Sequence, residues 1–296
     1  MLAVALLWDG IWGEPSTPWH PVAWLGRTIS ALRPAHLTHP ARNFVWGLCI
    51  GLLLPSLVGA VGWVLLRAGW LALPLAIYLC TSSFSIRCLG EASVRVSEPL
   101  MREDIQGARA GLGWLCSRNA SQLTPAQLSA GAIESVAENA SDSAVAPLFW
   151  FALLGLPGLM AYRVVNTMDA MWGYRDEREW LGKAAARLDD VLNWIPARVT
   201  AVLLVLADPP RARAGARAAW SDASNTESPN AGWPMAAIAG LLGLRLAKPG
   251  HYSLGSGREP SAQDIAPAWA ICQRAMRTWA GLVVFGLLAA ALYQLS

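Results

Sequence analysis

Two polar motifs flank an apolar stretch near the middle of this sequence, and both carry residue types that bind cations and phosphates. The first motif covers residues 134–142 and the second covers residues 166–176, with the almost wholly apolar residues 144–162 between them. Carboxylates are costly beside hydrocarbon unless they are paired or bind a ligand. The pattern therefore predicts a ligand site gathered around the apolar stretch.

The first motif carries three acids on what we expect to be one face of a helix over residues 129–142. Glu134, Glu138 and Asp142 are spaced four residues apart, which places them on one stripe. Three carboxylates on a stripe repel one another unless a cation lies among them, and Mg²⁺ commonly joins one or two carboxylates to substrate phosphates. The functional interpretation is a magnesium–nucleotide site with these acids as metal ligands, and the alternative is a solvated helix face. The adjacent amide of Asn139 favours the site.

The second motif combines amide, carboxylate, aromatic and guanidinium side chains. Its members are Asn166, Asp169, Trp172, Gly173, Tyr174 and Arg175. Arginine grips a phosphate or carboxylate through two parallel hydrogen bonds, and a glycine lets the backbone approach a ligand closely. The alternative interpretation is a helix C-terminus with a glycine cap.

A third cluster, at residues 187–198, contains two adjacent aspartates. Asp189 and Asp190 each share a helix face with Asn193, and adjacent aspartates suit a metal. The same aspartates would alternatively form ion pairs with Arg187 and Arg198 in a buried core. Both interpretations are open.

Two further polar segments lie outside these clusters. Ser228 and Asn230 belong to a turn-forming run whose backbone N–H groups suit an anion. His20 belongs to a polar segment near the start of an otherwise apolar region. No P-loop, dinucleotide-binding glycine pattern, nucleophile elbow or zinc-protease helix occurs. Any use of a nucleotide therefore requires an unfamiliar site.

The composition is that of a membrane protein. Of 296 residues, 54% are hydrophobic and only 15% are charged, against about 25% charged residues in ordinary soluble domains. A net charge of +3 without a basic stripe disfavours nucleic-acid binding. The five cysteines include no CxxC pair, so we expect them to be reduced.

The apolar segments predict an all-α, polytopic integral membrane protein built as a single membrane-embedded domain over residues 1–296. Residues 44–66 are a clean spanning candidate of about 34 Å as a helix, residues 68–84 are a second, and residues 279–295 are a short third. Arginines precede the first span and follow the second, so the positive-inside rule places both flanks in the cytoplasm.

Residues 144–167 pose a topological problem, because a simple span would separate the two polar motifs by the membrane. The segment contains Gly155-Leu-Pro157-Gly158, a strong helix breaker. We therefore predict a broken or re-entrant helical hairpin, with residues 147–154 entering and residues 159–167 returning. Broken helices are tolerated at membrane depth where protein or a cavity covers their backbone.

The polar segments together closely resemble those of one enzyme family. GEP, WHPVAWLGR, IESVAENASD, APLFWFALLGLPGLMAYRVVNTMDAMWGYR, AARLDDVLNWIPAR and SPNAG occur in that order. They resemble the adenosylcobinamide-phosphate synthase family of cobalamin (vitamin B12) biosynthesis, the CobD/CbiB proteins. This chain departs from the usual pattern at Glu14, where many members have Asp, and at Asn119, which replaces an Asp.

The resemblance implies an integral membrane ligase that uses ATP and Mg²⁺. It would join the free propionate of adenosylcobyric acid, a corrinoid, to the amine of (R)-1-amino-2-propanol or its O-phosphate. It also implies a multi-pass protein of the cell inner membrane, in contact with lipid. The positive-inside rule and the predicted hairpin would place its active site on the cytoplasmic side. A homo-oligomer is open, and the rival class is a non-catalytic transporter or corrinoid-handling scaffold.

This implied activity assigns the candidate residues to roles. The catalytic candidates are Asp169, Arg175, Asp190 and Arg198. The substrate-binding candidates are His20, Asn139, Asn166, Trp172, Gly173, Tyr174, Asn193, Ser228 and Asn230. The metal candidates are Glu134, Glu138 and Asp142. One aspartate would take the proton of the attacking ammonium, and the arginines would stabilise the phosphoryl group.

Overall fold

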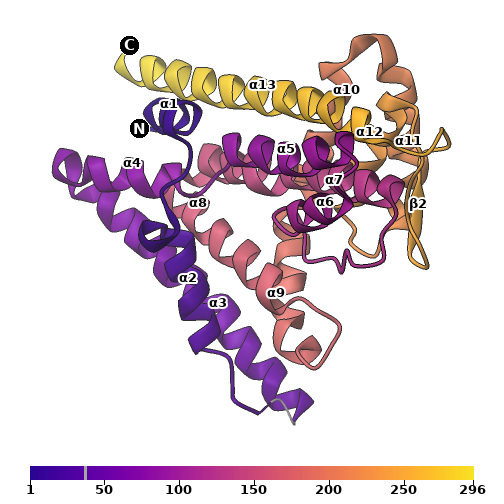
Figure 1. The fold of residues 1–296 in the computed structure, drawn as a ribbon. Coiled ribbons are helices and arrows are strands. Elements are labelled where there is room, and N and C mark those ends of the chain that lie inside the picture. Colours follow the sequence, from indigo (N-terminus) through magenta and orange to yellow (C-terminus); the bar gives the residue numbers. More distant parts are fainter. Residues whose placement is uncertain (37–38) are drawn as a thin grey trace. The chain divides into compact units, whose positions relative to one another are not determined.

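A computed structural model describes residues 1–36 and 39–296, and this part of the chain is mostly helical with almost no strands (Figure 1). The all-α prediction is therefore confirmed. The backbone falls into two compact units, which are described separately. Unit 1 consists of Met1–Ser85, Ala146–Asn193 and Val283–Ser296, and unit 2 consists of Ile86–Val145 and Trp194–Leu282. That residues 1–296 act as one domain stays a prediction.

Unit 1 is built from long apolar helices. Its elements are α1 (Leu2–Trp12), η1 (Thr17–Trp19), α2 (Pro21–Ala31), α3 (Pro40–Arg67), η2 (Gly69–Ala72), α4 (Leu73–Thr81), α8 (Ala146–Trp172) and α9 (Glu179–Leu192). Its core includes Ile29, Val164, Met168, Trp172 and Leu181, which come from α2, α8 and α9. Gly47 of α3 lies against the backbone of Leu181, where a Cβ atom would collide with the carbonyl oxygen. Helices α3, α8 and α9 are therefore tightly packed.

Unit 2 contains shorter helices and one small sheet. Its elements are α5 (Arg87–Met101), α6 (Ile105–Leu112), α7 (Pro125–Ala140), the π-helical turn η3 (Ser141–Val145), α10 (Trp194–Ala207), η4 (Pro209–Arg211), α11 (Ala212–Asp222), η5 (Ala223–Asn225), α12 (Gly232–Leu242), β1 (Leu246–Lys248), β2 (Tyr252–Leu254) and most of α13 (Ala262–Leu295). Strands β1 and β2 pair antiparallel, with Leu246 opposite Leu254. The sequence analysis expected helices throughout, and this hairpin of two three-residue strands is too short to produce an alternating pattern.

Among the residues that the structure describes, three segments are long and apolar enough to cross a membrane. They are Pro40–Arg67, Pro125–Trp172 and Ala262–Gln294, with α9 and α10 as a fourth if this bent pair is one broken span. The predicted spans at residues 44–66 and 279–295 lie inside α3 and α13, and both are confirmed. The helices are longer than predicted because they continue past the apolar run into polar residues.

The prediction of a second span at residues 68–84 is wrong. Its α-helical part is α4, which has 9 residues. A helix of that length extends only about 14 Å, less than half of a hydrocarbon core of about 30 Å. Gly69, with a φ of 70°, lies just after α3, and Pro74 holds the first turn of α4. The placement of both arginine-rich flanks in the cytoplasm assumed two full spans between them. Without the second span, this placement has no support from the two flanks.

The predicted break at residues 155–158 is confirmed. Gly155 has φ 66° and ψ −155°, a conformation that is open almost only to glycine. The carbonyl oxygen of Trp150 lies 2.7 Å from the place where a Cβ atom of Gly158 would stand. Eight residues of straight helix would separate these two positions by about 12 Å, so the chain turns sharply here. That both arms return to the same side of the membrane stays a prediction.

Candidate functional site

A polar network, partly buried, joins α8 and α9 inside unit 1. The Arg163 guanidinium donates to Asn166 Oδ1 at 3.1 Å, and Asn166 Nδ2 donates to Asp189 Oδ1 at 3.4 Å. The other carboxylate oxygen of Asp189 accepts from Asn193 Nδ2 at 2.9 Å, and Asn193 Oδ1 accepts from the Tyr162 hydroxyl at 3.0 Å. We call these five residues the α8–α9 network. Polar groups buried in an apolar unit are stable only when they are satisfied in this way.

Glu14, near the start of the chain, interacts with Arg163 of this network. The Glu14 carboxylate lies 3.4 Å from His20 Nε2, and the charge of Arg163 also acts on it. Burial alone would raise the pKa of Glu14, but hydrogen bonds from His20 and Ser85 and the neighbouring positive charges outweigh burial, so its pKa lies below the usual value. His20 also caps α2, because its Nδ1 accepts from the Val22 N–H at 3.2 Å. His20 therefore positions both a helix and a carboxylate.

Two more acids lie next to the network. Asp169 is near enough to Asp189 for their like charges to interact, and Asp190 adds a third. Asp190 also forms an ion pair with Arg187 at 3.4 Å, so the ion-pair interpretation of this cluster is partly realised. The aspartates of the second and third motifs are thus brought together within unit 1.

The end of the second motif is tightly constrained. A Cβ atom on Gly173 would overlap Asp169 Oδ1, so any larger residue here would displace the carboxylate that folds against it. Trp172 is 2% exposed and packs in the core of unit 1, a position that supports a packing role for its indole. Tyr174 lies beneath the guanidinium of Arg178, which pairs with Asp176.

A cavity of about 370 Å³ adjoins this part of unit 1. Its lining residues are Ser30, Arg33, Ala170, Met171, Trp172, Tyr174 and Arg178. The two arginines and the phenol are donors for an anion, although Arg33 is paired with Glu177 at 2.7 Å. The second motif therefore borders a space large enough for part of a substrate.

Unit 2 carries a separate buried ion pair. Arg118 donates to Glu134 Oε2 at 2.6 Å, and only 2% of the Glu134 side chain is exposed. Burial would lower the pKa of Arg118, but the charge of Glu134 and the hydrogen bond raise it above its usual value. Burial and then the charge of Glu134 raise the pKa of Tyr252, so this phenol stays neutral at physiological pH. Glu134 is thus neutralised by a residue that the sequence analysis did not select.

The other members of the first motif lie close to this pair. Glu138 is near enough to Tyr252 for its charge to act on the phenol. Asn139 is engaged within its own helix, since its Nδ2 donates to the Ser135 carbonyl at 2.9 Å and its Oδ1 accepts from Ser143 at 3.3 Å. Asp142 lies in the π-helical turn that follows α7. Across residues 1–36 and 39–296, no three His, Cys, Asp or Glu side chains are grouped as a metal site.

Arg198 is held between two indoles in unit 2. Its guanidinium stacks on Trp194 at 4.3 Å and on Trp233 at 4.8 Å, and it donates to Asn230 Oδ1 at 3.3 Å. The Ser228 hydroxyl accepts from the N–H groups of Asn230 and Ala231 at 3.2 and 3.3 Å, and these bonds hold the turn just before α12. Arg198 therefore contacts the residue 228–232 run, a contact that the sequence analysis did not predict.

The structure divides the predicted site residues between the units. Unit 1 holds His20, Asn166, Asp169, Trp172, Gly173, Tyr174, Arg175, Asp190 and Asn193, and unit 2 holds Glu134, Glu138, Asn139, Asp142, Arg198, Ser228 and Asn230. Their roles stay predictions. The sequence analysis did not select Arg163, although a lone cation in an apolar run three residues before Asn166 is a usable signal. It also missed Arg118 and Tyr252. No motif in the sequence around Tyr252 marks it as a functional residue.

Comparison with known proteins gives matches over nearly the whole chain. A family described as CobD/Cbib protein matches residues 2–279. The chain is 42% identical over 268 residues to the Cobalamin biosynthesis protein CobD of Dehalococcoides mccartyi, which covers 87% of this chain and 86% of that protein. It is 36% identical over 313 aligned residues to the protein of the same name from Rhodobacter capsulatus, covering 100% and 98%. No solved structure matches it.

Proposed function

The chain belongs to the CobD/Cbib family, and we propose on this basis that it is a membrane-embedded amide ligase of cobalamin biosynthesis. The family resemblance expected from the motifs is thereby confirmed. In the proposed reaction, the free propionate of adenosylcobyric acid and the amine of (R)-1-amino-2-propanol or its O-phosphate form an amide with consumption of ATP. The product is adenosylcobinamide or its phosphate.

The observation that carries this proposal is the α8–α9 network with Asp169 beside it. This apolar unit holds five hydrogen-bonded polar side chains, buried or partly buried, next to further carboxylates, and their hydrogen bonds fix a defined arrangement of donors and acceptors. Such preorganised groups stabilise charge that develops during a reaction. The network also lies within the segments that match the family motifs most densely.

A carboxylate does not condense with an amine at neutral pH without activation. We propose that a propionate oxygen attacks the γ-phosphorus of ATP, and ADP leaves. The amine then attacks the acyl carbon, and inorganic phosphate leaves with the oxygen that the propionate supplied. Asp169 or Asp190 accepts the proton that the ammonium must lose before attack, and Arg175 stabilises charge on the transferring phosphoryl group.

The residues present fit Mg²⁺ only as an ion that arrives with the nucleotide. Glu134 is already neutralised by Arg118, and the described residues contain no three-ligand group. A phosphate-bound Mg²⁺ needs just one or two protein carboxylates, which Glu138 and Asp142 would supply within unit 2. The ion would neutralise phosphate charge. Arg198, held between two indoles, is proposed as a phosphate ligand of the same unit.

The cellular location and the binding partners are part of the same proposal. The three candidate spans among the described residues support a membrane protein, and we propose the cell inner membrane with the substrate-binding side facing the cytoplasm, where ATP is present. The corrinoid, the amino alcohol and membrane lipid are its proposed partners. Association of identical chains is an open part of the proposal.

The test is identification of products by mass spectrometry. Purified protein is incubated with adenosylcobyric acid, ATP and Mg²⁺, with 1-amino-2-propanol or its O-phosphate in separate reactions. We expect a corrinoid whose mass has increased by the amine less one water, in reactions that contain ATP. Binding of the corrinoid without any new mass, for either amine, would instead support the transporter or scaffold interpretation.

Variants at the proposed proton acceptor sharpen the test. Asp169→Asn keeps the shape of the side chain and removes its basicity, so amide formation should fall by at least about 100-fold, within the range of general-base catalysis. The matched control is Asp104→Asn, which changes a helix-capping aspartate of unit 2. Equal activity of Asp169→Asn and the unmodified protein would remove Asp169 from the mechanism.

A further inference from the structure

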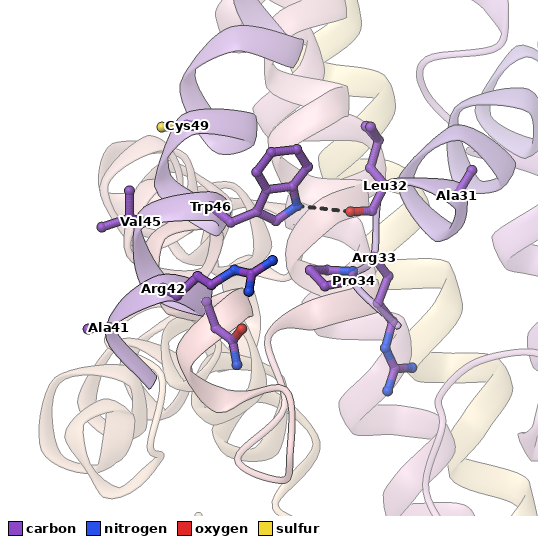
Figure 2. Close-up of a pocket in the computed structure, with 10 residues that line it drawn as sticks. Ala31, Leu32, Arg33, Pro34, Ala41, Arg42, Val45, Trp46 and Cys49 are labelled. Carbon is purple, nitrogen blue, oxygen red and sulfur yellow. Dashed lines mark hydrogen bonds between the residues drawn. The ribbon is translucent and has the colours of Figure 1, made fainter. Parts of the chain in front are cut away.

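A second cavity of unit 1 lies at the beginning of α3 (Figure 2), and none of the residues that line it belongs to the α8–α9 network. It has a volume of about 670 Å³. The described residues that line it are Ala31, Leu32, Arg33, Pro34, Ala41, Arg42, Asn43, Val45, Trp46 and Cys49. The end of α2 forms one wall, and the first turns of α3 form the other.

The α3 wall is a single stripe of one helix face. Arg42, Val45, Trp46 and Cys49 follow at i, i+3, i+4 and i+7, the spacing of neighbours along one side of a helix. The stripe begins with a cation and continues with apolar side chains towards the middle of the helix. The indole of Trp46 donates to the Leu32 carbonyl at 2.9 Å, and this bond ties the two walls together (Figure 2). The cavity therefore has a charged entrance and an apolar continuation.

The charges at the entrance are positive and incompletely compensated. Within the described part of the chain, Arg42 forms no hydrogen bond or ion pair, and Arg33 pairs with Glu177 at 2.7 Å. No acidic side chain lies among the described lining residues. The site is thus complementary to an anion, while its interior is complementary to hydrocarbon.

We propose that this cavity binds one anionic phospholipid from the surrounding bilayer. The phosphodiester lies at Arg42 and Arg33, and an acyl chain follows Val45 and Cys49 along α3. Helix α3 is itself a candidate span, so its first turns lie where lipid headgroups meet the hydrocarbon. Trp46 has the amphipathic ring that is enriched at this depth. A basic pocket beside a spanning helix is a known type of lipid-headgroup site.

The first test measures lipid retention by native mass spectrometry. The full-length protein is reconstituted in nanodiscs of phosphatidylcholine with or without phosphatidylglycerol, and the lipids that stay bound after release are identified. We expect one retained phosphatidylglycerol per chain. Arg42→Gln should reduce its retention about fivefold, the factor that corresponds to about 1 kcal/mol for one arginine at an anionic surface.

The matched control removes the same charge from the other end of the same helix. Arg67 stacks on Trp63 at 4.8 Å, and Arg67→Gln should leave phosphatidylglycerol retention unchanged. Equal loss in both variants, or equal retention of phosphatidylcholine and phosphatidylglycerol by the unmodified protein, would overturn the proposal. This readout does not depend on ligase activity.

The second test uses Cys49 as a reporter inside the cavity. Cys49 is exposed, whereas Cys80 and Cys272 are buried. In detergent, phosphatidylglycerol should slow the reaction of Cys49 with a maleimide, and phosphatidylcholine or inorganic phosphate alone should not. Protection by inorganic phosphate alone would show that the site binds a free anion and would reject the lipid. An unchanged rate with phosphatidylglycerol would also contradict the proposal.

Discussion

Gly173 shows how closely the residues of the second motif are fitted to one another. The sequence analysis predicted a glycine that permits close approach, and the structure identifies the approaching group as the Asp169 carboxylate. The Gly173 N–H also donates to the Asp169 carbonyl at 2.7 Å. Residue type and spacing were therefore enough to select Asp169 and Gly173, whereas their direct contact required coordinates.

Gly173→Ala should impair catalysis more than folding. The added methyl group would displace the Asp169 carboxylate, so we expect kcat to fall at least about tenfold while the melting temperature changes by only a few degrees. Amide formation and thermal unfolding are measured on the same preparation. The control is Gly286→Ala, where nothing lies within 4 Å of the added atom. A fully active Gly173→Ala protein would show that the position of Asp169 is not critical.

Tyr162→Phe tests whether the α8–α9 network stabilises unit 1. Tyr162 is 1% exposed, and loss of its hydroxyl leaves the buried Asn193 Oδ1 without this donor. An unsatisfied buried acceptor costs about 1–3 kcal/mol, which should lower the melting temperature by several degrees. Tyr293→Phe, at an 83% exposed tyrosine, should have no measurable effect. Equal melting temperatures of the two variants would contradict a stabilising network.

The lowered pKa of Glu14 predicts a specific dependence of the protein's stability on pH. Because its folded-state pKa is lowered, ionised Glu14 stabilises the fold above its usual pKa, and this contribution disappears as the pH falls through the folded-state pKa. Glu14→Gln should therefore melt at a lower temperature than the unmodified protein at neutral pH. The difference should shrink as the pH falls from about 5 to about 3. Glu91→Gln, at an exposed i,i+4 ion pair, should show a small difference at every pH.

At the scale of helices, local chemistry sets ends and breaks that apolar composition does not reveal. Helix α7 begins at Pro125 behind a capping box of Thr124 and Gln127, four residues before the start predicted at residue 129, whereas α8 breaks at the Gly155 that the sequence analysis selected. The second predicted span failed because apolar composition does not distinguish one long helix from a short one. Gly69 and Pro74 set the true boundary, and their local conformation outweighed the hydropathy of the run.

Gly155→Ala tests the break in α8. A Cβ atom is strained at φ 66° and ψ −155°, so the substitution should cost about 1–3 kcal/mol of stability. The same substitution at Gly281 meets nothing within 4 Å and should be neutral or slightly stabilising, because alanine is the better helix former. Denaturant-induced unfolding in detergent compares the two variants. A neutral Gly155→Ala would indicate that α8 is continuous in the membrane.

At the scale of the whole molecule, composition and motif order identified the class and the family. They did not reveal the pairing of Arg118 with Glu134, or the approach of Tyr252 to that pair from a strand far along the chain. These contacts depend on tertiary packing, which brings together residues that share no helix face. The sequence analysis therefore found the acids of unit 2 and assigned them to a metal without their arginine partner.

The most direct test of the proposed ligation follows the oxygen atoms of the substrate. Adenosylcobyric acid labelled with ¹⁸O at both propionate oxygens is converted with ATP and 1-amino-2-propanol, and the products are separated by mass. The account predicts one ¹⁸O in the amide and the other in inorganic phosphate, in equal amounts. An amide formed with no ¹⁸O in any phosphate-containing product would contradict activation of the propionate by ATP.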